Sequence, residues 1–154
     1  MLTIVQTGFH DPEFALCFQI RLDVFVREQN VPLAEERDAH DATALHFLAS
    51  TEDGPVATAR VLMLEDGVAK ISRVAVLQPA RGRGMGAALM RHIEKTVSAS
   101  AYLLDAQIQA LPFYEKLGYR HYGEAFMEAG IAHLHMRKPN RSFCRPAWRA
   151  IGSD

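Results

Sequence analysis

The sequence has little that would place the protein in a membrane, secure it with disulfides or bring it to a secretory route. No apolar run approaches the roughly 18 residues that a membrane-spanning helix needs. Residues 1–10 lack the basic stretch followed by an apolar one that marks a signal peptide. Cysteine is scarce: Cys17 and Cys144 are present, and their spacing suits no metal site. We therefore expect a cytoplasmic protein with reduced thiols and no membrane partner.

An excess of charge of one sign is also lacking. The chain has 17 Lys and Arg against 18 Asp and Glu, a formal net charge of −1, so no overall basic field favours nucleic acid as a partner. The 154 residues are 49% hydrophobic, enough for one core, with no repeat or linker. We expect a single domain over residues 1–138 and a basic tail over 139–154. The tail alternates arginines with aromatic residues: Arg141, Phe143, Arg145, Trp148 and Arg149.

The apolar periodicity changes several times along the chain and predicts both strands and helices. Alternating segments bounded by turn signals predict strands over residues 2–7, 45–49, 56–64, 68–77, 102–106, 119–126 and 131–137. Helical spacing predicts a first helix capped by Asp11, a second over 88–97 and a short third over 111–117 that Gly118 ends. This order predicts an α/β (α+β) fold, a mixed, mostly antiparallel sheet of about seven strands flanked by helices.

A cluster of glycines and arginines stands between a predicted strand and a predicted helix. Its sequence is Arg-Gly-Arg-Gly-Met-Gly over residues 81–86. Glycines let the backbone approach an anion, and a helix N-terminus directs free N–H groups at it. The cluster therefore predicts a site for a phosphate or pyrophosphate.

The same glycines formally satisfy a dinucleotide fingerprint, with Asp105 at the end of the next strand as a candidate ribose ligand. Two features weigh against a nicotinamide cofactor. Residues 78–81 separate the strand from the glycines, and the preceding strands read as an antiparallel meander rather than as alternating strands and helices. A small NAD(P)-binding oxidoreductase nevertheless stays open as an alternative.

Residues 81–86 resemble the core motif of the GNAT family of acetyl-CoA-dependent N-acetyltransferases. A second family element, an aromatic pair followed by a short helix end and Gly-aromatic, is present over residues 113–119. The resemblance extends over about residues 44–138. The segment 24–29, and the Glu-x-Gly-Ile-x-His pattern over 128–133, are similar to the small bacterial ElaA/YjcF-type branch.

The resemblance implies a GNAT-like sheet, acetyl-CoA as co-substrate, no metal, and direct transfer to a primary amine of a small molecule or peptide. It implies that Tyr114 is the general acid that protonates the departing thiolate, although packing on the short helix is an alternative role. The residues that it implies for coenzyme binding are Val74, Ala75, Val76, Arg81, Gly82, Arg83, Gly84, Met85, Gly86, Gln107, Phe113 and Tyr114. Gln107 stands where many members have asparagine.

Hairpin register suggests an acceptor side independently of the resemblance. If Asp66-Gly67 is a two-residue turn, Arg60 falls opposite Arg73, and like charges directly opposed repel. Both should then find a carboxylate, and the candidate partners in the chain are Glu28, Asp38 and Asp41. The cluster would be either an acceptor pocket or a buried ion-pair network.

A base must also take a proton from the ammonium form of the acceptor. The candidates are Glu28, Asp41, His46 and His133, of which Glu28 and His133 are the predicted catalytic residues. The predicted acceptor-binding residues are Glu28, Asp41, His46, Arg60 and Arg73. A non-catalytic acyl-CoA-binding module stays open as a second alternative, and a homodimer is compatible with the family resemblance.

Overall fold

The computed structural model describes residues 1–143, and in this part of the chain seven strands form one sheet in the order β1-β2-β3-β4-β5-β7-β6. The strands are β1 (Thr3–Thr7), β2 (Leu45–Thr51), β3 (Gly54–Met63), β4 (Val68–Val76), β5 (Ala101–Gln107), β6 (Arg120–Glu128) and β7 (Ile131–Pro139). The predicted tail residues Cys144, Arg145, Trp148 and Arg149 lie outside the described residues.

Helices and short helical turns connect the strands. The α-helices are α1 (Glu13–Arg21), α2 (Leu33–Glu36), α3 (Met85–Thr96) and α4 (Leu111–Lys116). A π-helix, η1 (Leu22–Glu28), continues α1. The 3₁₀ turns are η2 (Ala39–Ala42), η3 (Glu65–Gly67), η4 (Gln78–Ala80) and η5 (Ile108–Ala110). The predicted mixed, mostly antiparallel sheet flanked by helices is confirmed.

The start of α1 differs from the prediction. Its N-cap is Pro12, and no side chain caps the helix. The Asp11 carboxylate instead accepts a hydrogen bond from the Gly8 N–H at 2.8 Å, so it closes the preceding turn. The predicted Asp11 cap is therefore wrong, because a competing local donor takes its carboxylate.

The end of α4 follows the prediction. Gly118 has a φ of +99° just after the helix, and its N–H bonds to the Glu115 carbonyl while the Tyr119 N–H bonds to that of Tyr114. This pair of bonds is a Schellman motif, which favours glycine at this position. It fixes the end of the helix that carries Tyr114.

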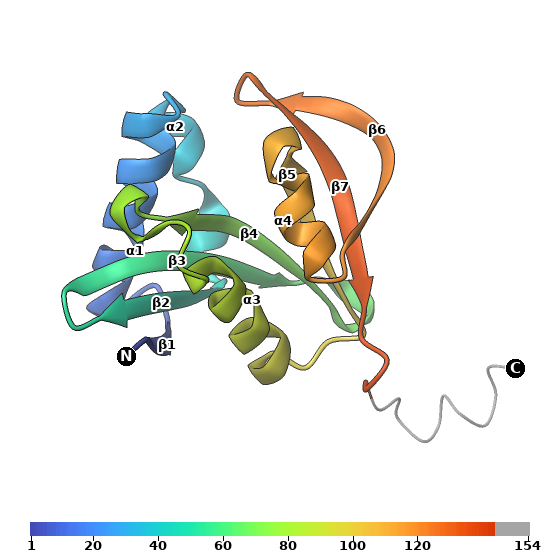
Figure 1. The fold of residues 1–154 in the computed structure, drawn as a ribbon, viewed down its shortest axis with the longest axis horizontal. Coiled ribbons are helices and arrows are strands. Elements are labelled where there is room, and N and C mark those ends of the chain that lie inside the picture. The colour runs from blue at the N-terminus through green and yellow to red at the C-terminus, as the bar shows by residue number, and fades with distance from the viewer. Residues whose placement is uncertain (144–154) are drawn as a thin grey trace, which may run out of the picture.

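Strands β4 and β5 separate in a V shape, which we call the fork, with the two strands as its arms (Figure 1). These two strands are parallel, are connected through α3, and pair only from Val68 to Lys70 against Ala101 to Leu103. Beyond that point they separate, so the facing edges of both strands lack a neighbouring strand. Helix α3 packs against one face of the sheet and buries Leu89, Met90 and Ile93 in the main core.

The β3–β4 hairpin has a longer turn than the sequence suggested. The turn η3 includes Glu65 as well as Asp66 and Gly67, and the extra residue moves the register by one. Arg60 consequently pairs with Ser72. The predicted Arg60–Arg73 cross-strand pair is wrong, although both side chains do find carboxylates.

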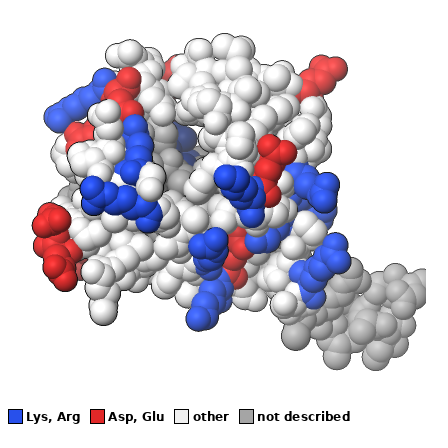
Figure 2. Space-filling view, in the orientation of Figure 1, with Lys and Arg blue, Asp and Glu red and all other residues white. Residues whose placement is uncertain are grey.

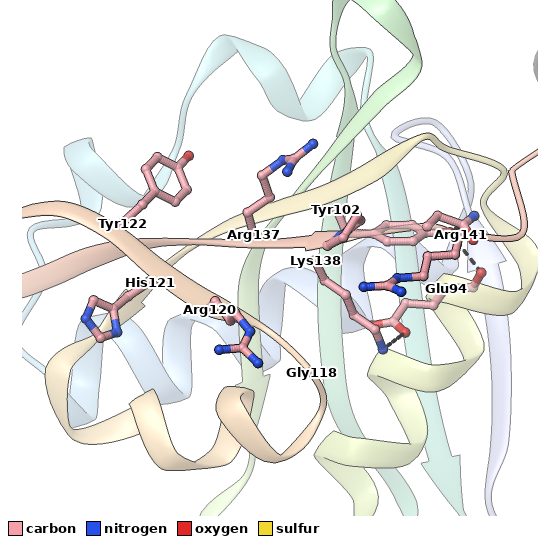
Figure 3. A pocket seen from close by; sticks show the side chains of 11 residues that line it. Glu94, Tyr102, Gly118, Arg120, His121, Tyr122, Arg137, Lys138 and Arg141 are labelled. Atoms are coloured by element: carbon pink, nitrogen blue, oxygen red, sulfur yellow. Dashed lines mark hydrogen bonds and ion pairs between the residues drawn. The ribbon is translucent and has the colours of Figure 1, made fainter.

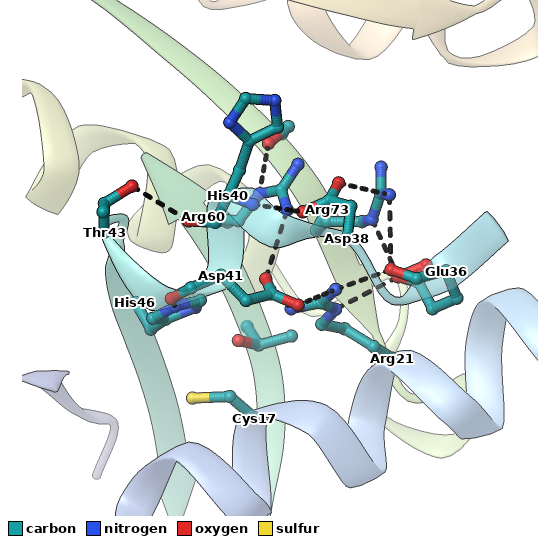
Figure 4. Close-up of polar contacts among 12 residues, drawn as sticks. Cys17, Arg21, Glu36, Asp38, His40, Asp41, Thr43, His46, Arg60 and Arg73 are labelled. Atoms are coloured by element: carbon teal, nitrogen blue, oxygen red, sulfur yellow. Dashed lines mark hydrogen bonds and ion pairs between the residues drawn. The ribbon is translucent and has the colours of Figure 1, made fainter. Parts of the chain in front are cut away.

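Those carboxylates belong to a closed ring of ion pairs (Figure 4). Each arginine contacts two acids and each acid contacts two arginines, in the order Arg21, Glu36, Arg73, Asp38, Arg60, Asp41 and back to Arg21. We call this set the ion-pair ring. With three positive and three negative groups it is neutral, and it joins α1, α2, η2, β3 and β4.

The inner half of the ion-pair ring is deeply buried. The Arg21 side chain is 1% exposed; its Nε lies 3.0 Å from Glu36 Oε1 and its Nη1 2.8 Å from Asp41 Oδ1. Arg60 Nη1 lies 3.1 Å from the same Asp41 oxygen. Burial favours a higher pKa for Asp41, but hydrogen bonds from Arg21 and Arg60 outweigh it and hold the pKa below its usual value.

The outer half of the ring faces solvent through Asp38. Arg60 Nη1 lies 2.6 Å from Asp38 Oδ1, and Arg73 Nη2 lies 3.3 Å from Asp38 Oδ2. Arg73 Nε lies 2.8 Å from Glu36 Oε1, close enough for an ion pair but not aligned for a hydrogen bond. The pKa of Asp38 is also lowered, because the two arginines outweigh its partial burial.

Removing one member of the ring should destabilise the fold strongly. We expect Arg21→Met to cost about 3–5 kcal/mol in the free energy of unfolding, since it leaves Glu36 and Asp41 buried with fewer cations. The control is Arg27→Met, whose exposed i,i+4 pair with Asp23 should be worth about 0.5 kcal/mol or less. Urea unfolding measures both, and equal losses would contradict a structural role for the ring.

Acid should remove this difference. A carboxyl whose pKa is lowered by folding stabilises the protein above its unfolded pKa, and that contribution is lost as the pH falls through the folded value. Asp38 and Asp41 are such groups, whereas burial raises the pKa of Glu36, so this partner of Arg21 is protonated first as the pH falls. The stability of the parent and of Arg21→Met should therefore converge below about pH 4.

Candidate functional site

The opening of the fork continues into a cleft of about 1060 Å³. Figure 2 shows the molecular face hollowed between the half that carries α1 and α2 and the half that carries β5 to β7. The cleft is lined by β4, the end of β5, the glycine cluster, α4, the end of η1 and the β6–β7 turn. Most of the predicted site residues therefore meet around one cavity.

The glycines of the cluster are favoured either by a left-handed backbone conformation or by close packing. Gly82 and Gly84 have φ values of +76° and +79°, in the left-handed region that disfavours side chains. Gly84 is also the N-cap of α3 and offers no side-chain acceptor to the first N–H groups of that helix. A Cβ on Gly86 would lie 3.2 Å from the Phe113 ring and 3.5 Å from Val76. The free N–H groups and the positive end of α3 can thus face an anion.

The Arg81 side chain is hydrogen-bonded to other groups of the chain. Its Nη1 and Nη2 donate to both carboxylate oxygens of Glu28, at 2.6 and 2.7 Å, and its Nε donates to the Val76 carbonyl at 2.8 Å. The sequence suggested Glu28 as a partner of Arg60 or Arg73. That prediction is wrong, because Glu28 pairs with Arg81. The Arg81 guanidinium lowers the pKa of Glu28, which keeps this carboxylate ionised and makes it a weak proton acceptor.

Gln29, the residue after η1, contacts the end of β5 on the other arm of the fork. Gln107 Nε2, at the end of β5, donates to Gln29 Oε1 at 2.8 Å, and Gln109 Nε2 donates to Gln107 Oε1 at 2.6 Å. Glu28 and Gln29 thus connect the end of η1 to both separated strands. Gln107 lines the cleft, where its amide is already hydrogen-bonded.

Tyr114 projects from α4 into the cleft and is 8% exposed. Its ring meets those of Phe113 and Tyr119 edge to face, with centroids 4.9 and 6.0 Å away. Burial raises the pKa of Tyr114 well above its usual value, so its hydroxyl stays protonated at neutral pH. A buried phenol in this position can donate a proton.

His133 lines the same cleft, in β7, where it pairs with Gln107 of the neighbouring strand β5. Its Nδ1 lies 2.7 Å from the Ile131 carbonyl. A carbonyl oxygen only accepts, so Nδ1 carries the hydrogen of the neutral ring and Nε2 keeps its lone pair. The ring also stacks on Phe126 at 5.7 Å. His133 can therefore accept a proton through Nε2.

The other predicted acceptor residues belong to the ion-pair ring or support it. Arg60 and Arg73 line the cleft, but their guanidinium groups contact Asp38, Asp41 and Glu36. His46 is 1% exposed and lies beside Asp41 of the ring, with Nε2 2.9 Å from the Asp41 carbonyl (Figure 4). Burial lowers its pKa, so it stays neutral.

Sequence reasoning missed the polar group at the base of the fork. Asp105 Oδ2 lies 3.1 Å from Lys70 Nζ, and Asp105 Oδ1 lies 2.5 Å from His135 Nδ1. Lys70 is the last residue of β4 that pairs with β5 before the two strands separate. The available signal was that Asp105 and His135 are polar residues in neighbouring strands, but their pairing requires the sheet order.

The sequence also gave no direct indication of Arg21 and Glu36 as members of the ion-pair ring. Arg21 follows Cys17 by four residues and precedes Val24 by three, so it lies on the buried stripe of the first helix. A charge on that stripe was the usable signal for Arg21. Its acidic partners come from another segment and could not be assigned from periodicity.

A second, basic pocket lies at the opposite end of the sheet (Figure 3). Arg120, Arg137 and Arg141 line it together with Glu94. The Glu94 carboxylate accepts hydrogen bonds from Tyr119 Oη at 2.7 Å and from Lys138 Nζ at 2.6 Å. This pocket contains none of the predicted catalytic or coenzyme-binding residues.

Residues 1–143 contain no cluster of three or more His, Cys, Asp or Glu side chains arranged to hold a metal ion. No helix within them combines the length and apolarity needed to cross a membrane.

Comparison with known proteins places these features in context. Residues 15–139 match the family model described as "Acetyltransferase (GNAT) domain". The uncharacterized N-acetyltransferase YjcF of Bacillus subtilis is 42% identical over 125 residues, covering 79% of this chain and 89% of YjcF. The crystal structure of Escherichia coli ElaA is 29% identical with a TM-score of 0.79, covering 90% of this chain and 99% of ElaA. An acyl-CoA N-acyltransferase from Pseudomonas aeruginosa is 27% identical with a TM-score of 0.77, at coverages of 90% and 99%.

Proposed function

Because the chain belongs to the GNAT acetyltransferase family, as residues 81–86 and 113–119 predicted, we propose that it transfers the acetyl group of acetyl-CoA directly to a primary amine. The acceptor is a small molecule or a peptide, and the reaction takes place in the cytoplasm. One observation carries the proposal: an uncapped helix N-terminus, a protonated buried phenol and an imidazole with a free lone pair line the same forked cleft.

The coenzyme is held by backbone groups. The N–H groups of the loop over residues 81–86 and the first turn of α3 bind its pyrophosphate. Beyond Lys70 the edge of β4 has no strand beside it, so the backbone of Val74 and Val76 pairs with the pantetheine arm as an added strand. Bound in this way, acetyl-CoA supplies an activated acyl group as a thioester.

The protons follow two separate paths. His133 Nε2 takes a proton from the acceptor ammonium, and the free amine nitrogen then attacks the thioester carbonyl carbon. When the tetrahedral intermediate collapses, the C–S bond breaks and the Tyr114 hydroxyl gives its proton to the thiolate; the nitrogen loses its second proton as the amide forms, and that proton restores the Tyr114 hydroxyl. The products are the N-acetyl amine and CoA with a free thiol, and no acyl group is attached to the protein.

Two other functions make different demands on the same cleft. An acyl-CoA-binding module would use the loop over residues 81–86 without turnover. A dinucleotide-binding oxidoreductase would need Asp105 for a ribose, but that carboxylate is held by Lys70 and His135. Direct acetyl transfer uses the phenol of Tyr114 and the imidazole of His133 as well.

The first prediction concerns the ligand. Acetyl-CoA or CoA at about 100 times its dissociation constant should stabilise the fold by ~2.7 kcal/mol, because it binds only the folded state. Thermal unfolding with acetyl-CoA, CoA and NAD(P)H in parallel measures the shift. A shift with NAD(P)H alone would overturn the proposal.

The second prediction concerns Tyr114. Replacing it by Phe removes the proton donor but keeps the ring, so we expect kcat to fall by about a hundredfold while the acetyl-CoA affinity stays within about twofold. The assay is release of free thiol with any amine of a primary-amine panel that supports turnover. The control is Tyr122→Phe, at an exposed position in the basic pocket. An unchanged kcat in Tyr114→Phe would remove this residue from the mechanism.

The third prediction concerns His133. His133→Gln should lower kcat/KM by roughly a hundredfold at pH 7 and should recover as the pH approaches about 10, where a simple alkylamine loses its proton to solvent. The pH profile of thiol release measures this, with His121→Gln as the control. A deficit that does not depend on pH would show that His133 is not the base.

A further inference from the structure

The β4 strand contains a strained residue directly before the segment that faces the coenzyme. Arg73 has a φ of +52°, in the left-handed region where residues other than glycine, asparagine and aspartate are uncommon. The register with β3 shifts here, because Arg60 pairs with Ser72 but Thr58 pairs with Ala75. Arg73 and Val74 therefore form a β-bulge, an extra residue in one strand.

The bulge determines which backbone groups of β4 face the fork. Side chains and N–H groups alternate along a strand, so one extra residue reverses the orientation of everything that follows. Val74 is the second residue of the bulge, Ala75 and Val76 follow it, and all three line the cleft. The conformation of Arg73 thus sets the orientation of the backbone that the pantetheine arm would pair with.

The ion-pair ring supplies the force that can hold Arg73 in this conformation. Its guanidinium is anchored by Glu36 on one side and Asp38 on the other. Its Nη2 also lies 3.4 Å from the carbonyls of Glu35 and Glu36. The remaining ring contacts fix Glu36 and Asp38 in turn, through Arg21 and Arg60. A strained backbone persists where the surroundings over-determine it.

We propose that Arg73 is a positioning residue for acetyl-CoA: the ion-pair ring holds its side chain, and thereby holds the bulge that orients residues 74–76 toward the coenzyme. This inference rests on the proposed function. It differs from the expected acceptor-binding role of Arg73, since the guanidinium acts through the backbone and touches no substrate.

A matched pair of variants separates the bulge from the ring. Arg73→Ala and Arg73→Gly both remove the guanidinium, but glycine adopts a positive φ without strain and alanine does not. We expect both to unfold at lower urea concentration than the parent. We expect the Kd for acetyl-CoA, measured by titration calorimetry, to rise about tenfold in Arg73→Ala and to return to within about threefold of the parent in Arg73→Gly.

The outcomes are distinguishable from failure of the proposed function. If the parent does not bind acetyl-CoA, the proposed function falls and this inference falls with it. If the parent binds and the two variants bind equally, whether like the parent or equally weakly, the bulge is not the link and the inference is overturned. A purely structural ring would lower the stability of both without separating their affinities.

A second pair covers the case in which Arg73→Ala does not fold. Asparagine tolerates the left-handed region and glutamine tolerates it less well, while neither carries a charge. Arg73→Asn should therefore bind acetyl-CoA several-fold more tightly than Arg73→Gln. Equal affinities in this pair would overturn the inference as well.

Discussion

The ion-pair ring is the constraint on which the α1–α2 half of the molecule depends. Its six charged groups come from segments that are distant in sequence, and each is satisfied by two others. Taking these charges out of water is costly, and the cost is offset only while the set is complete. The ring therefore couples the position of α1 and α2 to β3 and β4: none of these elements can move alone without leaving a charge uncompensated.

The second constraint is the separation of β4 and β5, and the two constraints meet along β4. The open strand edge supplies hydrogen-bonding groups that no neighbouring strand uses. The α3 N-terminus lies at one end of this edge, and the Lys70–Asp105 ion pair lies at the base of the fork. Contacts of Glu28 and Gln29 connect the end of η1 to both arms. A coenzyme in the fork would meet backbone groups that are already positioned, which lowers the entropy cost of binding.

Local features could be predicted from the sequence, and features that need exact register could not. The glycine cluster and the α4 end follow from backbone conformations that only nearby residues decide, so Gly118 was assigned correctly. The Arg60–Arg73 pair failed because one extra turn residue moves a whole strand. Arg21 was missed because its partners lie in other segments. Glu28 was assigned to the wrong arginines, since charge alone does not say which cation is near.

The neutrality of the ring also limits which acidic side chains of the cleft can bind a cationic ligand. The segment after η1 carries several acids, but Glu36, Asp38 and Asp41 each contact two arginines of the ring and are not free to bind a cationic ligand. Among the residues that the structure describes, Glu35 and Glu128 line the cleft without an ion-pair partner, and they come from opposite walls. These two unpaired acids therefore belong to α2, next to the ring member Glu36, and to the end of β6, which contributes no member to the ring. The Glu35 side chain can therefore be replaced without loss of a ring contact, whereas its neighbour Glu36 cannot.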